Sequence, residues 1–128
     1  MTETASAPAP DPRRLLGRYG EQLAVRYLTD RGWSVLDRNW RCAHGEIDVV
    51  ARDGDCLVFC EVKTRTTERF GGAIEAVDHR KAARLRRLAA AWLQCHDERA
   101  PRVRIDVIGI LRPRHGPAQL RHLVGVGS

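Results

Sequence analysis

Residues 45–65, which read GEIDVVARDGDCLVFCEVKTR, constrain the fold more than any other stretch of this sequence. Two apolar, β-branched runs flank the dipeptide Asp53-Gly54, and such a dipeptide between apolar runs is a strong signal for a β-hairpin. We therefore expect strands at 46–52 and 55–64. Both runs are apolar at consecutive positions rather than alternate ones, so both faces of this strand pair need to be covered.

Helical patterns lie on either side of this hairpin. Between residues 13 and 31 the apolar residues recur at spacings of three and four, which predicts an amphipathic helix that Gly32 ends. Asp78 is the expected N-cap of a second helix that runs to about Cys95. Further strands are expected at 33–40, 103–111 and 120–126. The resulting order, α-β-β-β-α-β-β, predicts an α/β sandwich with a mixed central sheet and one helix on each face.

Length and composition add the domain organisation. The 128 residues suit a single domain, which we expect at 13–128 after a disordered N-terminal tail at 1–12, rich in Ala and Pro. No stretch is long and apolar enough for a membrane span, so no membrane partner is expected. The four cysteines form no CxxC pair and are interpreted as free thiols, which predicts a cytoplasmic protein.

The net charge of +6 indicates a polyanionic partner such as nucleic acid, although a merely solvated basic surface explains the charge equally well. Only two of the 22 basic residues are lysines, namely Lys63 and Lys81. Against this arginine background Lys63 stands out, because a lysine is a compact point charge whose pKa can move on burial.

Three charged residues lie inside the apolar runs of the hairpin: Asp48 in the first strand, and Glu61 and Lys63 in the second. Charges at such positions are costly unless they are paired or bind a metal ion. Glu61 and Lys63 share a face because they are two residues apart. If Asp53-Gly54 forms a two-residue turn, Arg52 pairs with Asp55 and Asp48 lies opposite Phe59, on that same face.

Asp48 and Glu61 would then be diagonal neighbours about 7–8 Å apart. Converging carboxylates favour a divalent cation, and Mg²⁺ or Mn²⁺ suits a site of a few carboxylates, waters and phosphate oxygens. With Lys63 beside a phosphate, the set matches metal-assisted phosphodiester hydrolysis. The simpler alternative is a Glu61–Lys63 ion pair on an edge strand with Asp48 in solvent.

At these residues the sequence resembles the PD-(D/E)XK nuclease superfamily, with Asp48 in the first motif position and Glu61-Val62-Lys63 in the second. The proline that gives the motif its name is replaced by Ile47. Over roughly residues 15–112, the segments GRYGEQLAVRYLTDRGWSVLDRNWR, GEIDVVARDGDCLVFCEVKTR and RIDVIGI resemble the YraN-like family of small bacterial predicted endonucleases. That family is similar to archaeal Holliday-junction resolvases, which implies a restriction-endonuclease-like fold.

The resemblance also implies that Glu21, on the first helix, completes the metal site with Asp48 and Glu61; an ordinary solvated glutamate is the alternative. Glu46, two residues before Asp48, is either a group that supports the metal ligands or simply a charge at the start of its strand, and we favour the latter. The expected nucleic-acid contacts are Arg65, Arg69 and Lys81. Asp106 is expected to be a structural partner of a buried arginine and not a metal ligand.

Two classes of function therefore remain open, and an RNA-processing factor is a third possibility, because no aromatic platform or RNA-specific motif decides between DNA and RNA. The first is a Mg²⁺-dependent endonuclease that acts on DNA, including branched or processed DNA. The second is a non-catalytic module that binds nucleic acid or scaffolds a partner on the same fold. Because resolvase-like nucleases often act as dimers to cut two strands, a homodimer is a further expectation.

Overall fold

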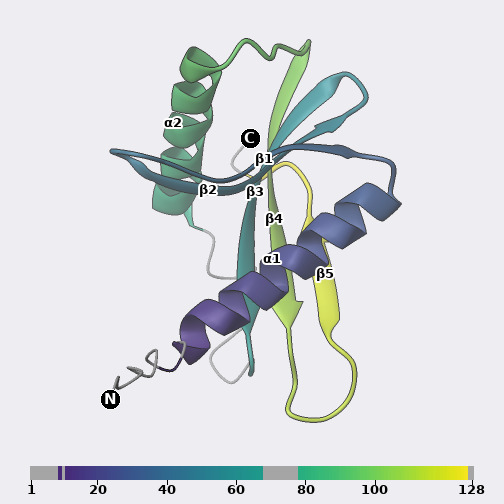
Figure 1. Ribbon diagram of the computed structural model, residues 1–128. Coiled ribbons are helices and arrows are strands. Elements are labelled where there is room, and N and C mark those ends of the chain that lie inside the picture. Colours follow the sequence, from purple (N-terminus) through teal and green to yellow (C-terminus); the bar gives the residue numbers. More distant parts are fainter. Residues whose placement is uncertain (1–8, 10, 68–77, 127–128) are drawn as a thin grey trace, which may run out of the picture.

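The structure, a computed structural model, describes residues 9, 11–67 and 78–126. Two helices and five strands follow one another in the order expected from the sequence (Figure 1). In chain order they are α1 Pro12–Asp30, β1 Ser34–Cys42, β2 Gly45–Asp53, β3 Cys56–Arg65, α2 His79–Cys95, β4 Arg102–Leu111 and β5 Gln119–Leu123. Most of the predicted tail, and Arg69 in the predicted loop, lie outside the described residues.

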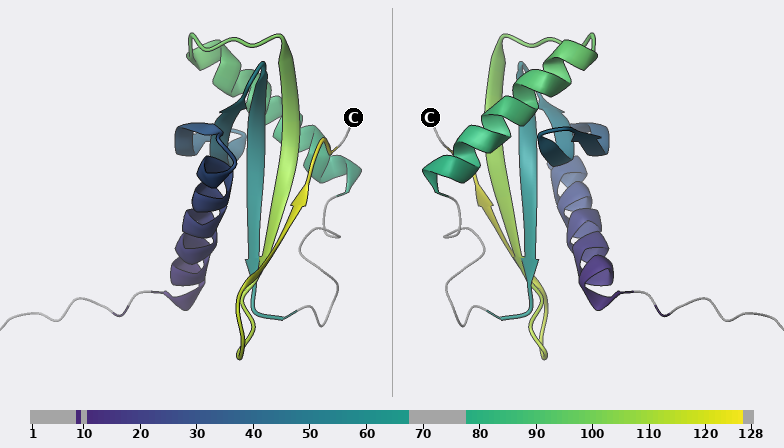
Figure 2. Two further views of the ribbon diagram at one scale, coloured as in Figure 1. Left: turned by 90° about the vertical axis from the view of Figure 1, so that its right-hand side faces the viewer. Right: turned by 90° about the vertical axis from the view of Figure 1, so that its left-hand side faces the viewer.

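The five strands form one sheet in the order β1-β2-β3-β4-β5, and only the β3–β4 pair is parallel. The helices cover opposite faces of this sheet, as Figure 2 shows. The predicted α/β sandwich with a mixed central sheet is therefore confirmed. Neither of the two described helices is long and apolar enough to cross a membrane.

The central strand β3 is buried on both faces, which explains its nearly continuous apolar sequence. Val58 and Cys60 pack on the α1 side in a cluster with Leu28. Leu57 and Phe59 pack on the other side, against α2 residues that include Trp92. The alternation along β3 thus divides the core into an α1-side cluster and an α2-side cluster.

The β2–β3 hairpin has a different tip from the one predicted. Asp53 pairs with Cys56 and Arg52 with Leu57, so the two-residue turn is Gly54-Asp55 and the expected pairing of Arg52 with Asp55 is wrong. Gly54 has φ of +57°. A glycine with positive φ at the first central position is what a type II′ turn requires, whereas the predicted tip would have placed it second.

A second departure from the predicted register occurs at Asp48. Val49 packs in the α1-side cluster, as regular alternation from Ala51 predicts, yet Ile47 packs in the α2-side cluster. Residues two apart in a regular strand share a face, so the alternation breaks between them. Asp48 lies at this break, and its direction could not be counted from the turn.

Buried polar contacts connect the far edge of the sheet to α1. The carboxylate of Asp106, fully buried in β4, accepts hydrogen bonds from Arg104 at 2.8 and 3.1 Å and pairs with His122 Nε2 at 2.7 Å. His122 Nδ1 lies 2.9 Å from the Tyr27 hydroxyl on α1. Burial acts to raise the pKa of Asp106, but hydrogen bonds from His122, Arg104 and the Gly125 N–H outweigh it and lower that pKa. Asp106 therefore has the structural role predicted for it.

Gly20 sets the distance between α1 and β3. A Cβ atom at this buried position would lie 2.9 Å from Thr64 Cβ and would overlap Thr64 Oγ1. A contact this short is possible only because glycine has no side chain, so the sequence here specifies a close approach of helix and strand. Because Glu21 is the next residue, this approach also brings Glu21 to the sheet.

We expect Gly20→Ala to lower the free energy of unfolding by about 1–3 kcal/mol, because the added methyl group forces α1 away from β3. Thr64→Ala in the same chain should recover part of this loss by removing two of the clashing atoms. Urea unfolding followed by circular dichroism measures both effects.

Gly17→Ala is the matched control, because a Cβ added there meets no atom within 4 Å. It should stabilise the protein by up to about 1 kcal/mol, since alanine favours the helix. Equal stability changes for Gly17→Ala and Gly20→Ala would show that α1 does not depend on close packing at Gly20.

Candidate active site

Three carboxylates converge between α1 and the start of β2. One oxygen each from Glu21, Glu46 and Asp48 lies within 4.8 Å of the other two. Glu21 comes from α1 through the close approach at Gly20, and Glu46 and Asp48 come from the segment of β2 where the alternation breaks. We call these three residues the acidic cluster.

Asp48 is the most perturbed member of the acidic cluster. Its Oδ2 accepts a 2.7 Å hydrogen bond from the backbone N–H of Val62 on β3, so the side chain bridges the two strands. The pKa of Asp48 is raised to about 7, mainly by burial and further by repulsion from Glu21, Glu46 and Glu61. The hydrogen bond from the Val62 N–H acts in the opposite direction. At neutral pH this carboxyl group is therefore poised between its protonated and charged forms.

Glu21 is held from the opposite side by β1. Its pKa is also raised, mainly by burial, although a hydrogen bond from the Asn39 side chain and the charges of Arg38 and Arg18 favour the carboxylate. Asn39 is the only described non-glycine residue with positive φ, at +53°. Asparagine tolerates this backbone region better than most residues, and here the conformation accompanies a contact to the acidic cluster.

Glu61 and Lys63 share a face, as predicted, but this face belongs to α2. Glu61 is 7% exposed, and its Oε1 lies 3.6 Å from Lys63 Nζ and 3.3 Å from Arg84 Nη2. Its Oε2 lies 3.9 Å from Lys81 Nζ and accepts no hydrogen bond from any residue that the structure describes. Burial lowers the pKa of Lys81, and the neighbouring charges of Lys63 and Arg84 act in the same direction, against Glu61.

The structure thus brings together two of the three predicted metal ligands, Glu21 and Asp48, and adds Glu46. The expectation that Asp48 would join Glu61 and Lys63 on one face does not match the geometry, because the break in β2 directs Asp48 to Glu21. Glu61 is still near enough for its charge to raise the pKa of Asp48.

The predicted nucleic-acid contacts lie in different places. Lys81 belongs to the cation group around Glu61, and Arg65 is exposed at the end of β3, which continues one residue beyond the expected end at residue 64. Arg69 is outside the described residues.

The position of Glu46 two residues before Asp48 was a signal in the sequence that these side chains share a face. Regular alternation, however, gave no reason to expect that both side chains point toward α1. Arg84 gave no signal among the many arginines.

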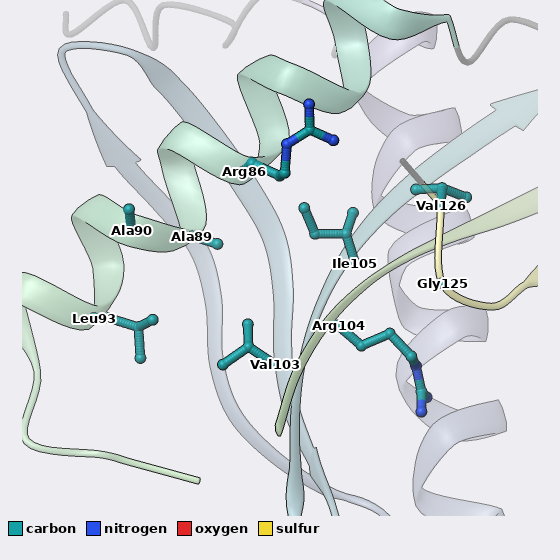
Figure 3. Close-up of a pocket in the computed structure, with 9 residues that line it drawn as sticks. All are labelled: Arg86, Ala89, Ala90, Leu93, Val103, Arg104, Ile105, Gly125 and Val126. Atoms are coloured by element: carbon teal, nitrogen blue, oxygen red, sulfur yellow. The ribbon is translucent and has the colours of Figure 1, made fainter. Parts of the chain in front are cut away.

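An open cleft leads to the acidic cluster. Its volume is about 520 Å³, and it is lined by α1 and by the β1–β2 hairpin through Arg14, Gly17, Arg18, Glu21, Asn39, Arg41 and Glu46. We call it the arginine cleft. A groove of about 380 Å³ between α2 and β4 is different in character, since Ala89, Leu93, Val103 and Ile105 make most of it apolar (Figure 3). Of these two sites, the arginine cleft is the one that combines cations with the candidate carboxylates.

The acidic cluster fits a hard divalent cation. Mg²⁺ and Mn²⁺ prefer oxygen ligands and are bound through one or two carboxylates in sites that act on phosphate groups. A cation here would relieve the repulsion among the three carboxylates and favour the charged form of Asp48. Such an ion, when bound, supplies Lewis acidity toward a phosphoryl oxygen.

Comparison with known sequences places this chain in a family. Residues 20–110, which include every residue of the acidic cluster, match the uncharacterised protein family UPF0102, and the chain belongs to that family. A UPF0102 protein from Kineococcus radiotolerans is 59% identical over 112 residues, which cover 87% of this chain and 92% of that protein. One from Nocardioides sp. is 50% identical over 127 residues, which cover 99% of this chain and 100% of that protein.

We expect Asp48→Asn to stabilise the metal-free protein at pH 8 by on the order of 2 kcal/mol. Asp48 has a folded-state pKa of about 7, whereas an unfolded aspartate titrates near pH 4. Between these values the folded chain holds a proton that the unfolded chain has lost, so wild-type stability falls as the pH rises. Asparagine does not ionise and can still accept the Val62 hydrogen bond.

The measurement is thermal unfolding in EDTA at pH 5, 6.5 and 8. The advantage of Asp48→Asn should grow across this series. Glu98→Gln is the control, because Glu98 forms an exposed ion pair with Arg52 and is not part of the acidic cluster. The stability difference between this variant and the wild type should not grow across the series. A pH-independent difference between wild type and Asp48→Asn would mean that the Asp48 pKa is not raised.

Proposed function

We propose that this protein is a nuclease that hydrolyses phosphodiester bonds in nucleic acid, with DNA as the expected substrate and Mg²⁺ or Mn²⁺ as the cofactor. The observation that carries the proposal is the acidic cluster, in which three carboxylates meet beside the cations of the arginine cleft. This arrangement supports the resemblance to the PD-(D/E)XK superfamily and to archaeal resolvases, because Asp48 and Glu61-Val62-Lys63 lie on adjacent strands and Glu21, from the middle of α1, lies beside Asp48.

The residues have separate roles in this proposal. Glu21, Glu46 and Asp48 hold the cation. Lys63, Lys81 and Arg84 face the phosphate and compensate the negative charge that develops on it. Glu61 keeps these three cations together through its contacts of 3.3–3.9 Å. A role for Glu61 as a further ligand, which the sequence motif implies, remains a prediction.

The second candidate, a module that binds nucleic acid without turnover, is favoured by one observation. Glu61 contacts cations of α2 rather than the acidic cluster, so the carboxylates of the motif do not form one group.

A cytoplasmic location belongs to the proposal as well, and is supported by the four free cysteines, Cys42, Cys56, Cys60 and Cys95. A homodimer that cuts two strands is also a proposal.

The test of catalysis is incubation with linear, flapped, four-way and single-stranded DNA, with and without Mg²⁺ or Mn²⁺. Asp48→Asn should weaken metal binding and be partly rescued by high Mn²⁺. Lys63→Ala should leave the metal bound but lower the rate by roughly 100- to 1000-fold, without rescue, since it removes one stabilising cation.

Arg87→Ala, which removes an exposed cation from α2 outside the group around Glu61, is the control and should cleave like wild type. If the protein binds DNA but cleaves none of these substrates with either metal, the binding module replaces the nuclease.

DNA affinity should fall steeply with added salt, because phosphate contacts release counterions. Arg65→Ala should weaken binding to all sequences alike and make the salt dependence shallower by about one unit of log–log slope. Fluorescence anisotropy at several salt concentrations measures both. An affinity that does not change between low and physiological salt would indicate a protein partner instead.

A further inference from the structure

The arginine cleft contains two cations, Arg14 and Arg18, that lie within ion-pair distance of no carboxylate that the structure describes, although the charge of Arg18 acts on Glu21. Arg41, by contrast, lies 3.4 Å from Glu46. Arg14 and Arg18 are one helical turn apart on α1, so both present guanidinium groups to the same side. Guanidinium groups in a concave site are suited to bidentate contact with phosphate.

The wall opposite α1 is fixed by β1. The left-handed backbone at Asn39 and its hydrogen bond to Glu21 connect the hairpin to the helix across the cleft. Glu21 and Glu46 belong both to the cleft lining and to the acidic cluster. A ligand in the cleft is therefore in contact with the candidate metal site.

The charges of the cleft determine the kind of ligand it accepts. The carboxylates of Glu21 and Glu46 repel a free anion, while the arginines attract one. A phosphate accompanied by a divalent cation satisfies both groups, because the cation takes the carboxylates and the guanidinium groups take the phosphate oxygens. An acidic peptide would offer carboxylates, which the same arginines bind, but it gives no reason for the adjacent acidic cluster.

The size of the cleft limits how much of a nucleic acid can enter. A volume of about 520 Å³ is that of a small-ligand pocket. It accommodates the backbone of one strand over one or two nucleotides, so the second strand of a duplex would lie outside the cleft.

We propose that the arginine cleft binds the sugar–phosphate backbone of a single nucleic-acid strand, and that Arg14 and Arg18 contact a phosphate next to the one held at the acidic cluster. This inference rests on the proposed function for one point, namely that the ligand is a nucleic acid. The strand then lies between α1 and the β1–β2 hairpin, on the opposite side of the site from Lys81 and Arg84. A single-stranded segment, such as a flap or an unpaired end, is the substrate feature that the cleft selects.

The test is the affinity for a fluorescent single-stranded oligonucleotide, measured by anisotropy in Ca²⁺ so that no turnover is required. Arg14→Ala/Arg18→Ala should bind at least about tenfold more weakly, as expected for the loss of charge-assisted hydrogen bonds. The dependence of log affinity on log salt should become shallower by about 0.7, the value for one neutralised phosphate on a single strand. Both arginines are exposed, so the variant should keep its wild-type unfolding temperature.

Arg26→Ala is the matched control, an exposed arginine on α1 that does not line the cleft, and it should bind like wild type. A blunt duplex of equal length should lose less affinity than the single strand in the double variant. Wild-type affinity and slope in Arg14→Ala/Arg18→Ala, or an equal loss in Arg26→Ala, would overturn the proposal. So would a loss confined to the duplex. None of these outcomes depends on cleavage, so an inactive protein leaves this test intact.

Discussion

The close approach of α1 to β3 at Gly20 is the contact on which the candidate site depends. It places a helix directly over the strand that carries Thr64, with only the Thr64 side chain between Gly20 and the strand, and it brings Glu21 within reach of β2. A larger residue at this position would increase the distance between helix and strand and take Glu21 away from Asp48. The geometry of the acidic cluster is thus set by a packing constraint in the core rather than by contacts among the carboxylates, which repel one another.

The break in β2 supplies the other half of the site. Regular alternation would direct Asp48 toward Glu61, and the structure directs it toward Glu21 and Glu46 instead. The Val62 N–H then satisfies a carboxylate, so this backbone donor is not lost where the two strands diverge. The result is two charged groups around a single central strand, with the acidic cluster toward α1 and Glu61 with its three cations toward α2.

Most of the fold could be predicted from the sequence because its signals are local. The 3.6-residue period of α1, the Asp78 cap and the apolar runs of β2 and β3 each determine their own element, and the order of elements determines the sandwich. The face of Asp48 could not be predicted in this way. It depends on a break in the alternation of β2 that no residue type marks; the different turn shifts the pairing by two residues, which leaves the faces unchanged. The role of Glu46 and the cations around Glu61 depend on that same tertiary arrangement.

The strand order divides the molecule into a local half and a non-local half. The β1–β2 and β2–β3 hairpins join neighbours in sequence, whereas the parallel β3–β4 pair can form only after the whole of α2 has been made. Non-local pairings of this kind are slow, because a long loop must close before any contact repays its entropy. The acidic cluster and the Val62 N–H that holds Asp48 lie between residues 21 and 62. A growing chain can therefore assemble the carboxylates before β4 leaves the ribosome, and the slow step of folding completes the sheet rather than the site.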